Sequence, residues 1–211
     1  MKLLLRISIV FLFCVAILLS SSPSTRAQAN PSAQSATAAA PAPPTSGVRW
    51  EILNELKGQE DKFVRLAQAI PAEKYTWRPA EGVRSVSEVF MHVAAANFNI
   101  PRLFGTQPPA GFKVQGFDKS VTDKAKVIET LKDSFAHLRE AIVAVPDSDV
   151  EKQLDWFGGK NTYRGVMIFI LRHMSEHLGQ SIAYARMNGI VPPWTEEQQQ
   201  RQQQSQQKPK Q

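Results

Sequence analysis

Apolar residues recur at helical spacing in four separate segments of this 211-residue chain, and proline or glycine residues lie between the segments. The clearest apolar stripe is about 80° wide on a helical wheel and consists of Val127, Leu131, Phe135, Leu138, Ile142 and Val145. Helices that share one such stripe are typical of domains built around a single core. Strand signals are absent apart from short ambiguous runs, so we predict an all-α fold, a four-helix bundle.

The predicted helices cover approximately residues 52–70, 85–104, 120–145 and 161–188. Pro71 and Pro146 end the first and third helices because proline cannot continue a helix. Ser85 and Glu88 have the spacing of a capping box at the start of the second, and Gly189 supplies a left-handed cap after the fourth. The loops on either side of the second helix are long, and such loops can line a pocket at the end of a bundle.

Residues 1–29 have the pattern of a secretory signal peptide, with Lys2 and Arg6 before an apolar run and an A-x-A cleavage site at Ala27–Ala29. The alternative is a retained membrane anchor, but the apolar run has only about thirteen residues and a span needs about twenty. We therefore expect an exported protein without a stable membrane span. Cys14, the only cysteine, would leave with the signal, which excludes disulfides and thiolate metal ligands in the exported chain.

The composition separates a folded domain, residues 48–194, from two flanking stretches. Residues 30–47 are rich in alanine and proline, residues 195–211 are rich in glutamine, and neither stretch has a large apolar cluster, so we predict that both are disordered. Removal of residues 1–29, which contain three basic and no acidic residues, lowers the formal net charge from +6 to +3. This charge is too small to indicate a nucleic-acid partner.

Three of the four histidines lie where two helices can bring them together. His173 and His177 are four residues apart in the last predicted helix, so their side chains lie within about 40° of each other, one turn apart. His92, in the second predicted helix, shares a line with Ala96 and Asn99 and is flanked by small apolar residues, as expected for a residue that faces another helix. Because neutral imidazole binds Zn, Ni, Cu or Fe(II), the three are candidate ligands of a metal ion with open positions.

Isolated histidines on helices are usually surface or core residues. We assign His137 to the surface because it lies more than about 100° from the middle of its helix's apolar stripe. The segment from His173 to His177 also matches H-x-x-E-H, a metalloprotease pattern with Glu176 as general base. That pattern needs an acidic third ligand downstream, where this chain has a short loop and a glutamine-rich stretch. Glu176 also lies about 100° from His177 around the helix, which favours a solvated position beside the site.

Three stretches together are similar to a known family, and they are Tyr75–Gly82 continuing through Ser85–Ala94, His173–Gln180, and Asn188–Pro193. By their order and spacing, residues 48–194 resemble the DinB/YfiT superfamily of metal-binding four-helix bundles. The resemblance implies that His92, His173 and His177 bind one divalent metal ion, zinc or nickel, with water completing the coordination. It also implies that Gln180 lies beside the site.

The resemblance leaves the activity open, because this superfamily includes thiol-dependent S-transferases and isomerases as well as members of unknown activity, and a fold does not fix a function. One hypothesis is a metal-dependent hydrolase or thiol S-transferase, with Glu176 or Gln180 orienting the nucleophile. Export counts against the thiol version because small thiol cosubstrates are mainly cytoplasmic. The alternative is a noncatalytic metal- or ligand-binding bundle of the cell envelope, with a homodimer as one candidate state.

Aromatic residues also lie in or beside the predicted loops, and they are Trp77, Trp156, Phe157 and Trp194. We expect them to pack against the ends of the helices. The alternative is that they line a pocket for an apolar small molecule.

Overall fold

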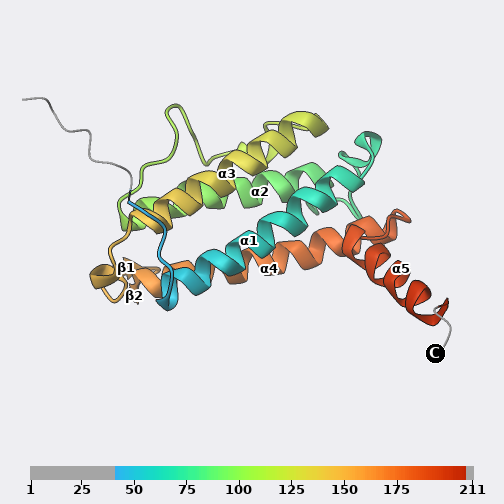
Figure 1. Ribbon diagram of the computed structural model, residues 1–211. Coiled ribbons are helices and arrows are strands. Elements are labelled where there is room, and N and C mark those ends of the chain that lie inside the picture. The colour runs from blue at the N-terminus through green and yellow to red at the C-terminus, as the bar shows by residue number, and fades with distance from the viewer. Residues whose placement is uncertain (1–40, 208–211) are drawn as a thin grey trace, which may run out of the picture. The chain divides into compact units, whose positions relative to one another are not determined.

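The computed structural model describes residues 41–207. The predicted signal peptide, residues 1–29, and residues 30–40 of the predicted linker lie outside the described residues. The described part is mostly helical, with five α-helices and one antiparallel hairpin (Figure 1): α1 (Gly47–Ala69), α2 (Val86–Asn99), α3 (Lys124–Ala144), β1 (Gln153–Trp156), β2 (Gly159–Thr162), α4 (Tyr163–Met187) and α5 (Pro193–Gln207). Among these helices, none combines the length and the apolar character that crossing a membrane requires.

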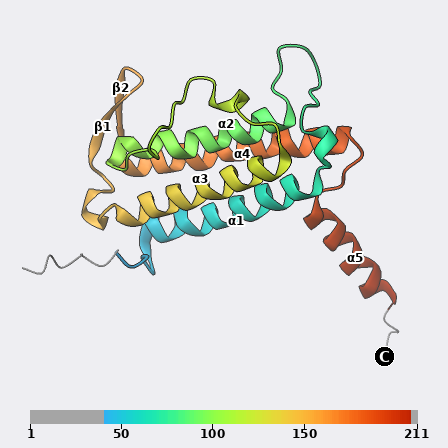
Figure 2. The same cartoon turned by 90° about the horizontal axis from the view of Figure 1, so that it is seen from above.

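The four long helices share one core. Helices α1 and α2 each pack against both α3 and α4, and the four run alongside one another in two perpendicular views (Figures 1 and 2). The Phe63 ring of α1 lies at the centre, with its centroid 6.3 Å from that of Phe90 in α2 and 5.9 Å from that of Phe135 in α3. Met174 and Ile170 of α4 are buried in the same cluster. The predicted apolar stripes therefore face one another.

Local hydrogen bonds fix the helix ends much as the sequence predicts. The capping box at the start of α2 is confirmed, because the Glu88 amide donates to Ser85 Oγ at 3.3 Å and the Ser85 amide donates to Glu88 Oε2 at 2.8 Å. At the start of α4, Thr162 Oγ1 accepts from the Gly165 amide at 3.0 Å. Gly189 follows the end of α4 with φ +75°, in the left-handed region that favours glycine.

Helix α2 is shorter than its apolar pattern predicts. The α-helix ends at Asn99, and Ile100–Phe104 continue as a 3₁₀ turn with Pro101 in its first turn. Proline has no amide hydrogen to donate to the preceding turn, so it interrupts the α-helical hydrogen bonds at this point.

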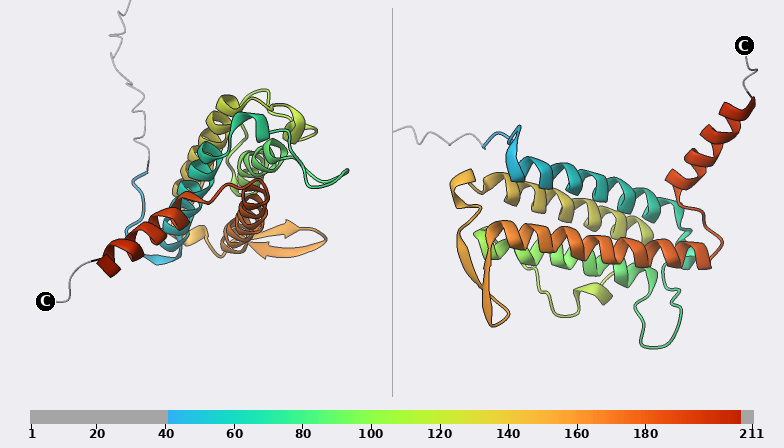
Figure 3. Two further views of the ribbon diagram at one scale, coloured as in Figure 1. Left: turned by 90° about the vertical axis from the view of Figure 1, so that its right-hand side faces the viewer. Right: turned by 90° about the horizontal axis from the view of Figure 1, so that it is seen from below.

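A β-hairpin, which the sequence interpretation did not predict, precedes α4. Its strands pair with Trp156 opposite Gly159, and the two turn residues, Phe157 and Gly158, have φ of 42° and 81°. A two-residue turn with both φ values positive matches the twist of antiparallel strands. The hairpin projects sideways from the packed helices (Figure 3).

The prediction that residues 195–211 are disordered was wrong for most of that stretch, because Pro193–Gln207 form α5. Proline is well suited to the first turn of a helix, and glutamine has a good helix propensity even without an apolar face. The beginning of α5 contacts α1, where Glu197 pairs with Arg65, and the rest of the helix projects away from the four long helices (Figure 2).

The surface position predicted for His137 was also wrong. The ring is half-buried, with its centroid 5.5 Å from that of Phe98, and its Nε2 is buried without a hydrogen-bond partner in the described chain. Phe112 and Phe117, from the loop between α2 and α3, pack on the same Phe98 ring. The loop aromatics therefore cover a side of α3 that its own sequence pattern marks as exposed.

Candidate metal centre

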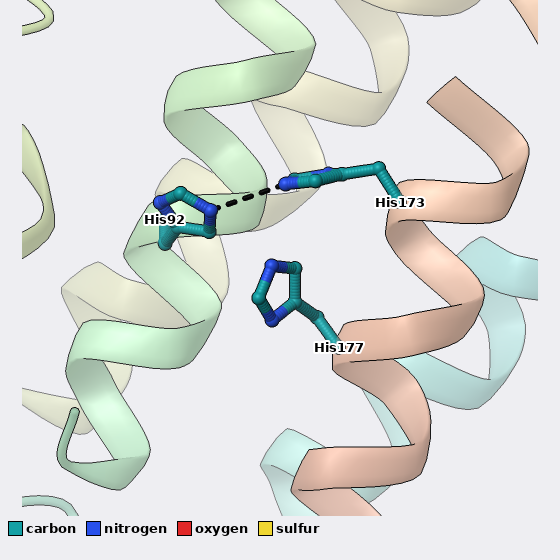
Figure 4. Close-up of side chains that lie close together, drawn as sticks. All are labelled: His92, His173 and His177. Atoms are coloured by element: carbon teal, nitrogen blue, oxygen red, sulfur yellow. Dashed lines mark hydrogen bonds between the residues drawn. The ribbon is translucent and has the colours of Figure 1, made fainter. Parts of the chain in front are cut away.

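The structure brings His92, His173 and His177 to one place between α2 and α4 (Figure 4). One ring nitrogen from each lies within 4.8 Å of the others, and the Nε2 atoms of His92 and His173 are 3.1 Å apart. Two nitrogen ligands at about 2.0–2.1 Å from a tetrahedral zinc ion would be about 3.3 Å apart. The His92 and His173 nitrogens therefore have nearly the spacing that a shared metal ion requires, and a nitrogen of His177 lies within 4.8 Å of both.

The helices position these rings through simple geometry. The four-residue spacing stacks His173 and His177 one turn apart on the side of α4 that meets α2. On α2, small side chains surround His92, because Ala95 and Ala96 occupy the next turn. Short side chains let the helix backbones approach and leave room for the imidazoles between them.

Burial keeps two of the three imidazoles neutral at pH 7. It is the main cause that lowers the pKa of His92 from 6.5 to about 4, followed by the Arg84 guanidinium. Burial likewise lowers the pKa of His173 to about 4, with the two neighbouring imidazoles and Arg84 adding to the effect. Only a neutral imidazole has a free lone pair, so these rings are in the protonation state that metal binding needs.

His177 is oriented by a series of contacts with residues outside the histidine cluster. Its Nδ1 donates to Gln180 Oε1 at 2.9 Å, and Gln180 Nε2 donates to the Tyr184 hydroxyl at 2.8 Å. The Tyr184 ring packs edge-on against Trp77 with centroids 5.4 Å apart. This hydrogen bond selects the tautomer of the neutral ring in which Nδ1 carries the proton and Nε2 the lone pair, as in histidine ligands oriented by an outer partner.

His173 differs from His177 in this respect. Its Nε2 faces His92, while its Nδ1 is buried and has no hydrogen-bond partner in the described chain. The ring is instead positioned by packing, since it stacks at 23° on Phe169 with centroids 6.2 Å apart. Together, three converging nitrogens, the neutral state of two rings and the fixed tautomer of the third fit a divalent cation.

A cavity of about 470 Å³ opens beside His92 and His173. Its walls come from α2, the loop that leads to α3, the hairpin and α4, and its charged residues are Arg84, Arg102 and Asp118. The Arg84 guanidinium pairs with Asp118 at 3.3 Å. The long loop after α2 thus lines a pocket, as the sequence predicts, and the hairpin supplies a second wall.

The candidate residues around the histidines occupy different positions. The Glu176 side chain is 57% exposed and pairs with Arg172 at 3.4 Å on the outer side of α4, away from the cavity walls. Gln180 contacts His177 on the side opposite its Nε2, so its position suits orientation of the ring. Trp156 and Phe157 line the cavity, whereas Trp77 and Trp194 pack against the core.

Several residues of the site were missed at the sequence level. Arg84, Asp118 and Arg102 lie in or next to turns, where periodicity gives no information about which side chains meet. The capping box was a usable signal for Arg84, because that residue immediately precedes Ser85 and so lies at the start of the helix that carries His92.

A sequence model of the DinB superfamily matches residues 55–181, a stretch that contains all three clustered histidines. The chain belongs to the DinB superfamily. Two solved structures of DinB-like proteins are similar in fold: one from Bacillus cereus, with a TM-score of 0.60, and one from Bacillus subtilis, with a TM-score of 0.54. Each is 19% identical in sequence, and each alignment covers 67% of this chain and 93% of the other. A search of curated proteins gave no match.

Proposed function

We propose that this DinB-like protein is an exported four-helix bundle that binds one divalent metal ion through His92, His173 and His177. The observation that carries the proposal is the convergence of one nitrogen from each ring within 4.8 Å. Three imidazoles in a half-buried position suit a borderline cation, and zinc or nickel is proposed. A cation held there would supply a Lewis acid, which can activate water for hydrolysis or a thiol for transfer.

The residues around the histidines have different proposed roles. Gln180 orients His177, and Phe169 positions His173 by stacking. Trp156 and Phe169 supply aromatic surface to the cavity beside His92 and His173. Asp118 is the only carboxylate among the described residues that line this cavity, and it is paired with Arg84. Glu176 is not proposed as a general base because it points away from this space.

The metal site is tested by elemental analysis and calorimetric titration of protein purified without a histidine tag. We expect about one equivalent of zinc or nickel, as three nitrogens around one point hold one ion. The variants H92A, H173A and H177A should lose it, whereas H137Q, which changes the one histidine outside the cluster, should keep it. Retention of metal by all three alanine variants would contradict the proposal.

The proposed activity is metal-dependent hydrolysis or thiol transfer. A screen of metal-loaded protein against esters, amides and thiol adducts tests it, with H173A as the inactive variant and H137Q as the matched control. Absence of turnover by metal-loaded protein would favour the second candidate, a noncatalytic metal- or ligand-binding protein of the cell envelope. That candidate is favoured by the ion pair between Asp118 and Arg84, since it leaves no unpaired carboxylate among the described residues that line the cavity.

Export is proposed from the sequence of residues 1–29 alone. Amino-terminal sequencing of the protein expressed with its full leader should find a chain that begins at Asn30. A chain that retains Cys14 would contradict cleavage. Gel filtration of the same sample distinguishes a monomer from the homodimer that remains a candidate state.

A further inference from the structure

The cavity beside the histidines carries one positive charge that no described carboxylate balances. Of its charged residues, Arg84 and Asp118 form an ion pair with each other. Arg102 has no acidic partner within 4.0 Å in the part of the chain that the structure describes. Its Nε donates to Asn99 Oδ1 at 3.2 Å, which leaves the other guanidinium donors available. Since an arginine fork matches a planar carboxylate, Arg102 is suited to recognise an anion.

The rest of the cavity is largely apolar and aromatic. Trp156 and Phe169 meet edge to face with centroids 4.9 Å apart and form one wall. At the rim, the Phe157 side chain is 89% exposed and Val114 is 54% exposed, although both are large apolar residues. Exposed apolar groups gathered at the mouth of a cavity are typical of a site that binds an apolar body.

Arg102 and the histidines lie at different positions along the cavity, separated in the direction of the α2 axis. Asn99 lies seven residues after His92, on nearly the same side of the helix, which corresponds to about 10 Å along the axis. Arg102 lies one further turn away, held at Asn99. A ligand that reaches both Arg102 and the histidines is therefore elongated.

We propose that this cavity binds an elongated carboxylate with an apolar, aromatic body, the carboxylate at Arg102, the body against Trp156 and Phe169, and the other end directed to His92 and His173. One unbalanced charge matches a monoanion better than a phosphate monoester, which carries nearly two charges at neutral pH. The inference rests on the proposed metal centre for the assignment of the histidine end as the reacting end. The anion site itself consists of other residues.

The charge preference is tested by calorimetric titration with three probes of one length: phenylhexanoate, its neutral amide and the corresponding amine. We expect the carboxylate to bind about tenfold more tightly than the amide, the scale of a charge-assisted hydrogen bond partly open to water. The variant R102Q should lose this preference. The matched control R186Q, at an exposed arginine of α4 that does not line the cavity, should keep it. In R102E the preference should shift to the amine.

The apolar contact is tested separately with Phe157→Asn, a replacement that tolerates the left-handed backbone. It should weaken all three probes by a similar factor and leave the preference for the carboxylate intact. Equal binding of the three probes to the unchanged protein, or an equal loss in R102Q and R186Q, would overturn the inference. Each titration is run with and without zinc, whose uptake is measured by elemental analysis. A carboxylate preference without zinc uptake would uphold this inference and refute the metal site, while zinc uptake without the preference would do the reverse.

Discussion

Replacement of Gln180 by leucine tests whether the hydrogen bond to His177 contributes to metal binding. In the structure the Gln180 amide joins two groups, accepting from His177 Nδ1 at 2.9 Å and donating to the Tyr184 hydroxyl at 2.8 Å. Leucine has a similar size but neither donor nor acceptor. In Gln180→Leu the His177 ring is free to rotate and to change tautomer, and both changes reduce the fraction of protein in which all three nitrogens converge.

The expected magnitude follows from comparable outer partners of metal-bound histidines, whose removal typically costs about tenfold to a hundredfold in metal affinity. This range corresponds to about 1.4–2.7 kcal/mol. Gln180 is half-buried, so water can replace part of the lost hydrogen bond. We therefore expect Gln180→Leu to weaken zinc binding by about tenfold, near the lower end of the range.

Competition titration against a chromophoric zinc chelator at fixed pH measures this change. Gln180→Glu should bind zinc at least as tightly as the unchanged protein, because a carboxylate is a stronger acceptor for the His177 Nδ1 proton. Tyr184→Phe removes the outer hydrogen bond alone and should have the smaller effect. If Gln180→Leu binds zinc as tightly as the unchanged protein, the hydrogen bond does not position the ligand and the reasoning fails.

Three further predictions concern the protein's stability, measured as the free energy of unfolding in urea. Ser85→Ala removes the acceptor of the Glu88 amide at the start of α2 and should cost about 1 kcal/mol; an unchanged free energy would show that the cap is not needed. Phe157→Gly removes a side chain from a left-handed position, φ 42°, and should stabilise by about 1 kcal/mol; a loss of stability would mean that the ring has a packing role despite its exposure. In metal-free protein, folding lowers the pKa of His92 and His173 from 6.5 to about 4, so the unfolded chain binds more protons than the folded protein between these pH values. The stability present above pH 6.5 should therefore be lost as the pH falls toward 4. A constant urea midpoint over this range would contradict the burial of the two rings.

The convergence of the histidines was predictable in large part because helix geometry fixes the face on which each ring lies. The period of the α-helix fixes the face on which His173 and His177 lie. The small residues beside His92 indicate that this face of α2 meets another helix. Helix geometry alone does not show that α2 and α4 are neighbours. The resemblance to a family implied that they are, and the structure shows the contact.

The sequence predictions were wrong or incomplete for segments whose structure depends on contacts between residues distant in the sequence, or for a helix made of polar residues. The hairpin has only Leu154 and Trp156 half-buried on β1, which is too short an alternation to separate from loop sequence. Helix α5 is polar after Trp194, and a sequence pattern indicates a helix by its apolar face. His137 is covered by Phe98 and loop aromatics, a contact that a helical wheel of α3 alone does not contain.

The metal-binding histidines and part of the cavity wall differ in the same way, because the first depend on regular helices and the second on loops. The histidines come from helices, so their geometry follows the backbone period and is held rigidly by the core. The loop before α3 and the hairpin supply the other part of the cavity wall, with Val114 and Phe157 exposed at the rim. Loops tolerate substitution and insertion better than packed helices do. A protein with this arrangement can therefore keep one metal-binding geometry while the loop and the hairpin determine which molecule reaches it. Arg102 lies in the middle of the 3₁₀ turn Ile100–Phe104 that joins the two parts, so the proposed anion contact depends on both.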